Sequence, residues 1–143
     1  MSSNNIVKFD NTLTDEELKQ IENDIARKGY TFGWPSNKRD EYGHWNCMFA
    51  GQDPNNRISV EQQLPPSIKQ IWSKIKQSIL PGYTAIRAYS NAYTYGTEGY
   101  VHTDSDIDTD RTVLIYLNKD WDRDWAGETV FFDDNELLEE NED

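Results

Sequence analysis

The stretch TVLIYLN, residues 112–118, is a run of β-branched and large apolar residues that is typical of a β-strand. Similar short runs occur at residues 6–9, 45–49, 83–94 and 128–133. Two amphipathic helical patterns precede most of these runs. Because the helices come first and most strands later, this order predicts an α+β fold with an antiparallel sheet rather than alternating βαβ units.

The first helix is predicted to begin at the capping box of residues 14–17, TDEE, and to end at Gly29. The second is predicted to begin at Pro65–Pro66 and to end at Pro81–Gly82. In both, apolar residues recur at helical spacing, so we expect each helix to pack one face against the sheet. Residues 51–64 between them are predicted to form a loop.

Length and charge restrict the class of protein. The chain has 143 residues, the length of one domain with its own core, and a formal net charge of −12. Such a charge repels phosphate backbones, so we expect no nucleic-acid partner and favour a basic peptide or a metal ion.

The single cysteine, Cys47, excludes an internal disulfide and a cysteine-rich zinc module. No stretch is typical of a membrane helix or signal peptide, so we expect a cytoplasmic protein without a membrane partner.

The stretch GYVHTDSDIDTD, residues 99–110, places His102 beside an alternating series of aspartates. An EF-hand calcium loop beginning at Asp104 requires Gly at its sixth position and Glu at its twelfth. Those positions hold Thr109 and Ile115, so the sequence does not fit an EF-hand.

A transition-metal site fits the same stretch better. In an extended strand, residues i and i+2 point to the same side, so His102 and Asp104 direct an imidazole and a carboxylate at one point. This donor pair suits Fe(II), Mn(II) or Zn(II). A solvated acidic turn is the alternative, and it is the commoner meaning of an isolated H-x-D.

The elements around H-x-D resemble the prolyl hydroxylase branch of the Fe(II)- and 2-oxoglutarate-dependent dioxygenases, which includes the collagen-type and the hypoxia-inducible-factor prolyl hydroxylases. In the family's order, they are a tyrosine-bearing strand, a glycine-rich approach, H-x-D, the strand leading into YLNKDWD (116–122) and a turn at 127–129. The resemblance covers residues 83–133. It implies a double-stranded β-helix, or jelly roll, supported by N-terminal helices. The single domain, 1–143, then has three parts: helical support at about 10–82, a jelly-roll part at about 83–135 and an acidic tail at about 136–143.

The resemblance also implies functional roles. His102 and Asp104 match two of the family's three iron ligands, while Tyr116 and Tyr89 match residues that bind 2-oxoglutarate. Ordinary packing in a sheet is the alternative for both tyrosines. The implied activity is hydroxylation of prolyl residues in a peptide or protein, with Fe(II) as cofactor, 2-oxoglutarate as cosubstrate and ascorbate as an optional further cofactor. An acidic rim around the iron favours a basic peptide.

The sequence departs from the family near residue 133. The family continues with further strands, a distal histidine that completes the iron triad, and an Arg or Lys that binds 2-oxoglutarate. No histidine follows His102, and His44 is predicted to be structural. We therefore expect the C-terminal strands to be missing and open strand edges to allow self-association. Three alternatives stay open: an inactive, truncated family member acting as a binding or assembly module, a site completed by further or second-chain residues, and an acidic calcium-binding domain.

Overall fold

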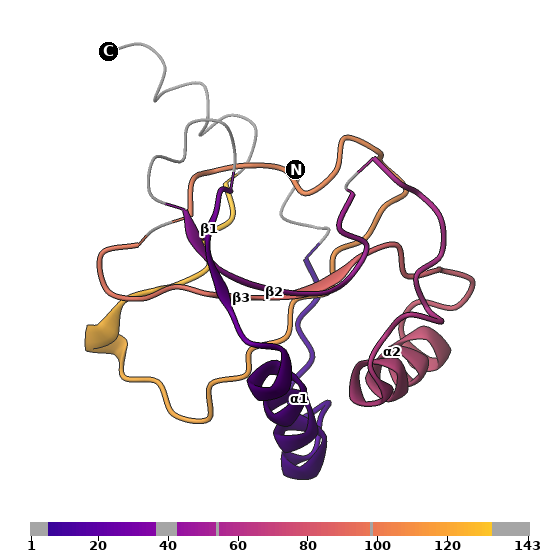
Figure 1. The fold of residues 1–143 in the computed structure, drawn as a ribbon, viewed down its shortest axis with the longest axis horizontal. Coiled ribbons are helices and arrows are strands. Elements are labelled where there is room, and N and C mark those ends of the chain that lie inside the picture. Colours follow the sequence, from indigo (N-terminus) through magenta and orange to yellow (C-terminus); the bar gives the residue numbers. More distant parts are fainter. Residues whose placement is uncertain (1–5, 37–42, 54, 98, 133–143) are drawn as a thin grey trace. The chain divides into compact units, whose positions relative to one another are not determined.

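The computed structural model describes residues 6–36, 43–53, 55–97 and 99–132 (Figure 1). Its elements, in chain order, are α1 (Asp15–Lys28), β1 (Thr31–Trp34), β2 (His44–Ala50), α2 (Pro66–Ser78), β3 (Ala88–Ala92) and the short 3-10 helix η2 (Arg123–Trp125). The chain divides into two compact units, one spanning Leu13–Lys119 and the other formed by the described parts of Met1–Thr12 and Asp120–Asp143. The predicted single domain and its internal boundaries stay predictions, and the predicted tail at 136–143 lies outside the described residues.

Helix α1 is defined by local signals at both ends. The Glu17 N–H donates to the Thr14 hydroxyl (3.2 Å), and the Thr14 N–H donates to the Glu17 carboxylate (2.8 Å). This reciprocal capping box satisfies backbone donors that have no partner within the helix. Arg27 and Lys28 in the last turn complement the helix dipole, and the helix ends at Gly29, whose φ is 79°. The predicted first helix is therefore confirmed.

Helix α2 begins with Pro66 at its first position, where the missing N–H of proline costs no helical hydrogen bond. It ends as the Ile79 N–H donates to the Ile75 carbonyl (2.8 Å). The predicted second helix and the loop before it are confirmed. No helix in the described part of the chain has the length and apolar character needed to cross a membrane.

Both helices lie on the same side of the sheet (Figure 1). The core between helices and sheet contains six buried residues, Ile21, Ile25, Cys47, Phe49, Ile71 and Ile75. A polar contact joins the helices beside this core, since the Ser67 hydroxyl on α2 donates to the buried Asp24 carboxylate on α1. Arg27 also donates to Asp24, so the buried charge is paired.

The sheet has the order β1-β2-β3, and both neighbouring pairs are antiparallel. The predicted antiparallel α+β fold is thus confirmed. Strand β1 was not predicted, because its four residues include Gly33 and give no clear alternation. The register shifts between Phe32 and Trp34, at Gly33, whose φ of 103° few other residues adopt.

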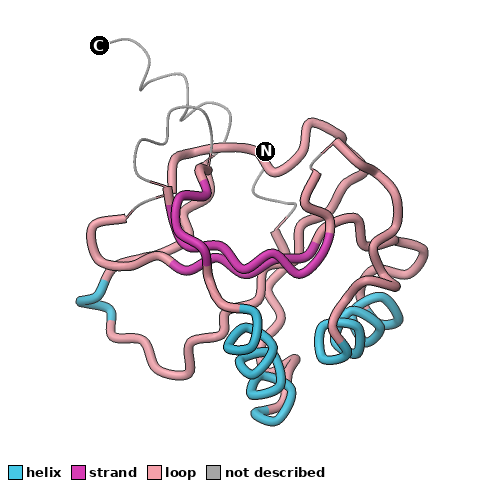
Figure 2. Tube along the Cα trace, viewed as in Figure 1, coloured by secondary structure: helices cyan, strands magenta, loops and turns pink. Residues whose placement is uncertain are grey.

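The strand predictions at 6–9 and 112–118 are wrong, since the structure has no strand there (Figure 2). The strand predicted at 128–133 is wrong for residues 128–132, and residue 133 lies outside the described residues. Residues 114–118 do keep a strand's alternation. Ile115 and Leu117 pack against the core, while Tyr116 between them is 64% exposed. The segment thus faces the core as a strand does, yet forms no ladder with another strand among the described residues. The jelly roll stays a prediction, because the described sheet has three strands.

In the second unit, η2 forms a turn that carries two tryptophans. The rings of Trp121 and Trp125 pack edge to face, with centroids 5.6 Å apart, and the Trp121 indole N–H donates to the Ala126 carbonyl (2.9 Å). Ala126 has φ 55° and ψ −152°, a conformation that favours glycine.

Candidate functional site

His102 and Asp104 are brought together on the loop that follows β3. The His102 Nδ1 lies 2.7 Å from the Tyr100 backbone carbonyl oxygen. Because a carbonyl only accepts hydrogen bonds, Nδ1 is the donor of this hydrogen bond, which leaves Nε2 as the ring nitrogen available to another group. That Nε2 lies 3.4 Å from Oδ1 of Asp104, and the two side chains are 38% and 37% exposed. The imidazole Nε2 and the carboxylate therefore face one another within reach of solvent.

This geometry fits a metal ion held by two side chains. With both metal–ligand bonds at about 2.1 Å, a right angle at the metal separates the donors by about 3.0 Å and a tetrahedral angle by about 3.4 Å. The Nε2–Oδ1 distance of 3.4 Å lies at the upper end of this range. The Nδ1–H bond to a backbone carbonyl is the usual outer support of a ligating histidine. Among the residues that the structure describes, no group of three or more His, Cys, Asp or Glu side chains is gathered for a metal.

The rest of the acidic loop is ordered by Asp110. Its carboxylate accepts hydrogen bonds from the Ser105 hydroxyl (2.7 Å) and from both terminal nitrogens of Arg57 (2.8 and 2.5 Å). Arg57 is the larger cause, and Ser105 the next, of the lowering of the Asp110 pKa to about 2. Since this carboxylate is engaged by an arginine, it is a poor calcium ligand, which weakens the alternative of an acidic calcium-binding loop.

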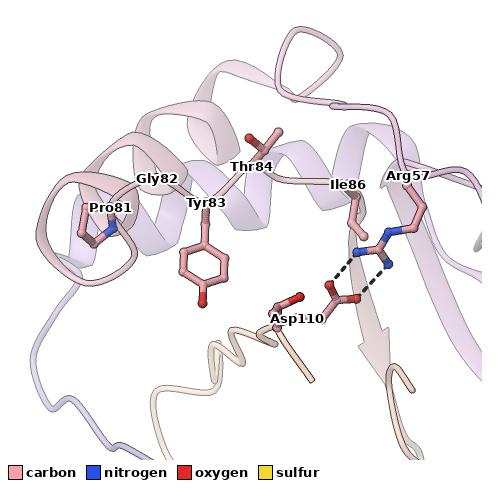
Figure 3. Close-up of a pocket in the computed structure, with 8 residues that line it drawn as sticks. Arg57, Pro81, Gly82, Tyr83, Thr84, Ile86 and Asp110 are labelled. Carbon is pink, nitrogen blue, oxygen red and sulfur yellow. Dashed lines mark hydrogen bonds and ion pairs between the residues drawn. The ribbon is translucent and has the colours of Figure 1, made fainter. Parts of the chain in front are cut away.

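A hollow of about 410 Å³ lies against this ion pair. Figure 3 shows the Arg57–Asp110 pair on one side of it and the Tyr83 ring on another. Its lining residues are Arg57, Pro81, Gly82, Tyr83, Thr84, Ile86, Thr109 and Asp110. None of the four predicted site residues lines it, so this hollow is separate from the His102–Asp104 pair.

Tyr89 lies on the sheet face opposite the helices. Tyr89 and Asn91 pair with Met48 and Asn46 on β2, and successive strand residues point to opposite faces, so this set lies opposite Cys47 in the core. The Asn46 side chain donates to the Asn91 side chain (2.8 Å). The sheet therefore has one apolar face covered by helices and one face that carries polar groups.

Arg87 was not identified from the sequence as a site residue. Its guanidinium carbon lies 4.9 Å from the centre of the Tyr89 ring, and Nη2 lies 3.5 Å from the Tyr89 hydroxyl. Arg87 is half-buried and forms no ion pair with any described residue. The i, i+2 spacing from Tyr89 was the available signal, since it predicts a shared face.

The predicted cosubstrate residues are not assembled into one pocket. Within the described ranges, no hydrogen bond or ring contact joins Tyr116 to Tyr89, and none joins either tyrosine to His102 or Asp104. His44 is buried at the start of β2 and stacks against Tyr93, with ring centroids 4.6 Å apart. The structural role predicted for His44 stays a prediction.

Comparisons with protein-family models, with curated proteins and with solved structures found no significant match to this chain.

Proposed function

We propose that this protein is an Fe(II)- and 2-oxoglutarate-dependent dioxygenase of the prolyl hydroxylase type, with prolyl residues of a peptide or protein as substrate. The observation that carries the proposal is the His102–Asp104 pair. Its Nε2 atom lies 3.4 Å from a carboxylate oxygen, and the opposite ring nitrogen is fixed by a backbone carbonyl. A site that binds a metal through both side chains requires this orientation.

The residues present fit Fe(II) through His102 Nε2 and one oxygen of Asp104, with the other coordination positions open to 2-oxoglutarate, oxygen or further ligands. When bound, iron and 2-oxoglutarate supply the oxidation: oxygen converts 2-oxoglutarate to succinate and carbon dioxide, and its second atom enters a substrate C–H bond. The chain's own task is to hold the donors and orient the cosubstrate. Ascorbate would serve as an optional reductant.

Tyr89 and Tyr116 are proposed to bind the cosubstrate. Arg87 adds a positive charge beside Tyr89 on the polar face of the sheet, which suits a dicarboxylate. The jelly roll belongs to the same proposal. Its support is that helices cover one sheet face, while Ile115 and Leu117 pack against the core from a segment without strand pairing.

The exposed carboxylates of Asp104, Asp106 and Asp108 favour a basic peptide as the substrate. Self-association through open strand edges is a further proposal. The free thiol of Cys47 is buried, and burial raises its pKa, so it is protected from oxidation. We propose a reducing cytoplasm as the location because the sequence has a single cysteine and so cannot form an internal disulfide.

The test is succinate release from 2-oxoglutarate with Fe(II), measured for the natural chain and for His102→Ala, Asp104→Ala and Asp108→Ala. The last variant is the matched control, since Asp108 is an exposed aspartate of the same loop. We expect release by the natural chain and by Asp108→Ala, and release at the level of free Fe(II) in the other two variants. Release that is insensitive to His102 would overturn the proposal.

A second candidate is an inactive family member that acts as a binding or assembly module. The observation that favours it is that no three potential metal ligands meet among the described residues. Mn(II) binding that depends on His102, together with the absence of succinate release from the natural chain, would support this candidate.

A further inference from the structure

The acidic loop is attached to a distant part of the chain through one residue. Arg57, in the connection between β2 and α2, reaches Asp110 across 53 residues of sequence and binds both of its carboxylate oxygens. Paired N–H donors matched to a carboxylate are the geometry in which an arginine fixes direction as well as distance. Figure 3 shows this two-point contact.

Arg57 itself projects from a well-supported segment. Before it, the Asn55 N–H donates to the Asp53 carboxylate (2.9 Å), and the Ile58 N–H donates to the Asn56 side chain (3.0 Å). Side chains that bond nearby backbone groups in this way hold tight turns. These hydrogen bonds hold the backbone on both sides of Arg57.

The segment after Arg57 is anchored to the helix-packed core. The Val60 N–H donates to the Ala85 carbonyl (2.9 Å). The Glu61 carboxylate accepts from the Trp72 indole (2.7 Å), from Lys76 (2.9 Å) and from the Ala85 N–H (3.2 Å). Arg57 therefore ties the acidic loop to a segment that is hydrogen-bonded to α2.

Within the acidic loop, Asp110 connects the Arg57 contact to the residue beside Asp104. Its carboxylate accepts from the hydroxyl of Ser105, the residue directly after Asp104, and the same hydroxyl accepts from the Ile107 N–H (3.1 Å). The Asp110 N–H donates to the Ile107 carbonyl (2.9 Å). Residues 105–110 form a closed turn whose two ends meet at the Asp110 carboxylate.

We propose that Arg57 is a positioning residue: by binding Asp110 at two points it holds the loop that carries Asp104 and so fixes the direction of the Asp104 carboxylate toward His102. The effect on metal binding rests on the proposed function, whereas the holding of the loop does not. A lysine makes a single-point contact and cannot fix the same direction, so Arg57→Lys is expected to hold the loop only in part.

The test uses the full chain and two readouts. Hydrogen exchange of the amides of residues 103–111 reports the loop, and the Mn(II) dissociation constant reports the His102–Asp104 pair. The variants are Arg57→Gln, Arg57→Lys, Asp110→Asn and the Arg57→Gln/Asp110→Asn double variant. Arg123→Gln is the control, because it removes an exposed arginine that forms no ion pair with any described residue.

We expect Arg57→Gln to speed exchange in the loop by about fivefold and to weaken Mn(II) binding by a similar factor, with the melting temperature nearly unchanged. The double variant should be no worse than the more severe single variant, since both remove one contact. Arg57→Lys should lie between, and Arg123→Gln should match the natural chain.

Unchanged loop exchange in Arg57→Gln would overturn the proposal. Faster exchange with an unaltered Mn(II) dissociation constant would also overturn it, because the loop would then move without affecting the His102–Asp104 pair. If the natural chain binds no Mn(II) through His102, the proposed function and the role of Arg57 toward a metal both fail. Loop exchange then decides by itself whether Arg57 holds the loop.

Discussion

The helix-covered side of the sheet and the segments that follow β3 are held by different forces. Between helices and sheet, six buried apolar residues pack together, and the contact there does not depend on charge. The loop of residues 99–110 is exposed over most of its length and depends on hydrogen bonds and one ion pair. The core is therefore expected to set the stability of the Leu13–Lys119 unit. Because the loop has few buried contacts, its local opening costs little free energy, and a ligand can alter its structure.

The largest effect is expected in the core. Ile71 of α2 is 3% exposed, so Ile71→Ala should lower the free energy of unfolding by about 3 kcal/mol, from lost burial and the cavity left behind. Ile58, in the loop before α2, is 71% exposed and is the control: Ile58→Ala should change stability by less than about 0.5 kcal/mol. Urea denaturation measures both. Equal effects would show that the core is not where the stability resides.

The sequence predicted the helix-packed core well, because its signals are local. The capping box at Thr14 and the apolar spacing in both helices depend on neighbours along the chain. Strand pairing depends on distant partners instead, so residues 114–118 alternate between exposed and core-packed side chains as a strand does while forming no ladder. Four-residue β1 is too short to show a pattern.

The candidate site divides in the same way. H-x-D was found because its two residues are adjacent on one side of an extended segment. Arg57 was not, since its contact with Asp110 exists only once distant segments have met. The partnership of Arg87 with Tyr89 is intermediate, because the spacing predicts a shared face but not the contact between the guanidinium and the ring.

The next largest effect is expected at Glu61, which joins the connection between β2 and α2 to side chains of α2. Lys76 first, and then Trp72, lowers the pKa of Glu61 below its ordinary value of 4.5. A lowered folded-state pKa means that the stabilisation is present above pH 4.5 and is lost as the pH falls through the folded-state pKa. Glu61→Gln should cost about 1 kcal/mol at pH 7 and should flatten the acid limb of the stability curve. Thermal denaturation from pH 3 to 7 measures this; an unaltered acid limb would contradict it.

A gain in stability is expected at the turn after η2. Ala126 has φ 55° and ψ −152°, where a Cβ is strained and glycine is not. Ala126→Gly should raise the free energy of unfolding of the turn by about 1 kcal/mol, despite the greater freedom of glycine in the unfolded chain. Hydrogen exchange of residues 121–127 measures the gain, and Ala92→Gly in β3, which lacks such strain, should instead destabilise its strand. Faster exchange in Ala126→Gly would show that the turn does not need this conformation.

The smallest effect separates the two regions by solvent alone. Exposed ion pairs weaken with salt, so raising NaCl from about 0.05 M to about 0.5 M should speed hydrogen exchange in residues 103–111 about twofold and leave the amides of α2 unaffected. Acid should weaken the Asp110 contact only at low pH. Because Arg57 and Ser105 lower the Asp110 pKa from 3.8 to about 2, its contribution is present above pH 3.8 and is lost only as the pH approaches about 2. The Asp110 contact should thus survive at pH 3.5, because the carboxylate is still ionised in the folded chain. Exchange that is insensitive to salt in the loop, or equally sensitive in α2, would mean that both regions are held by the same forces.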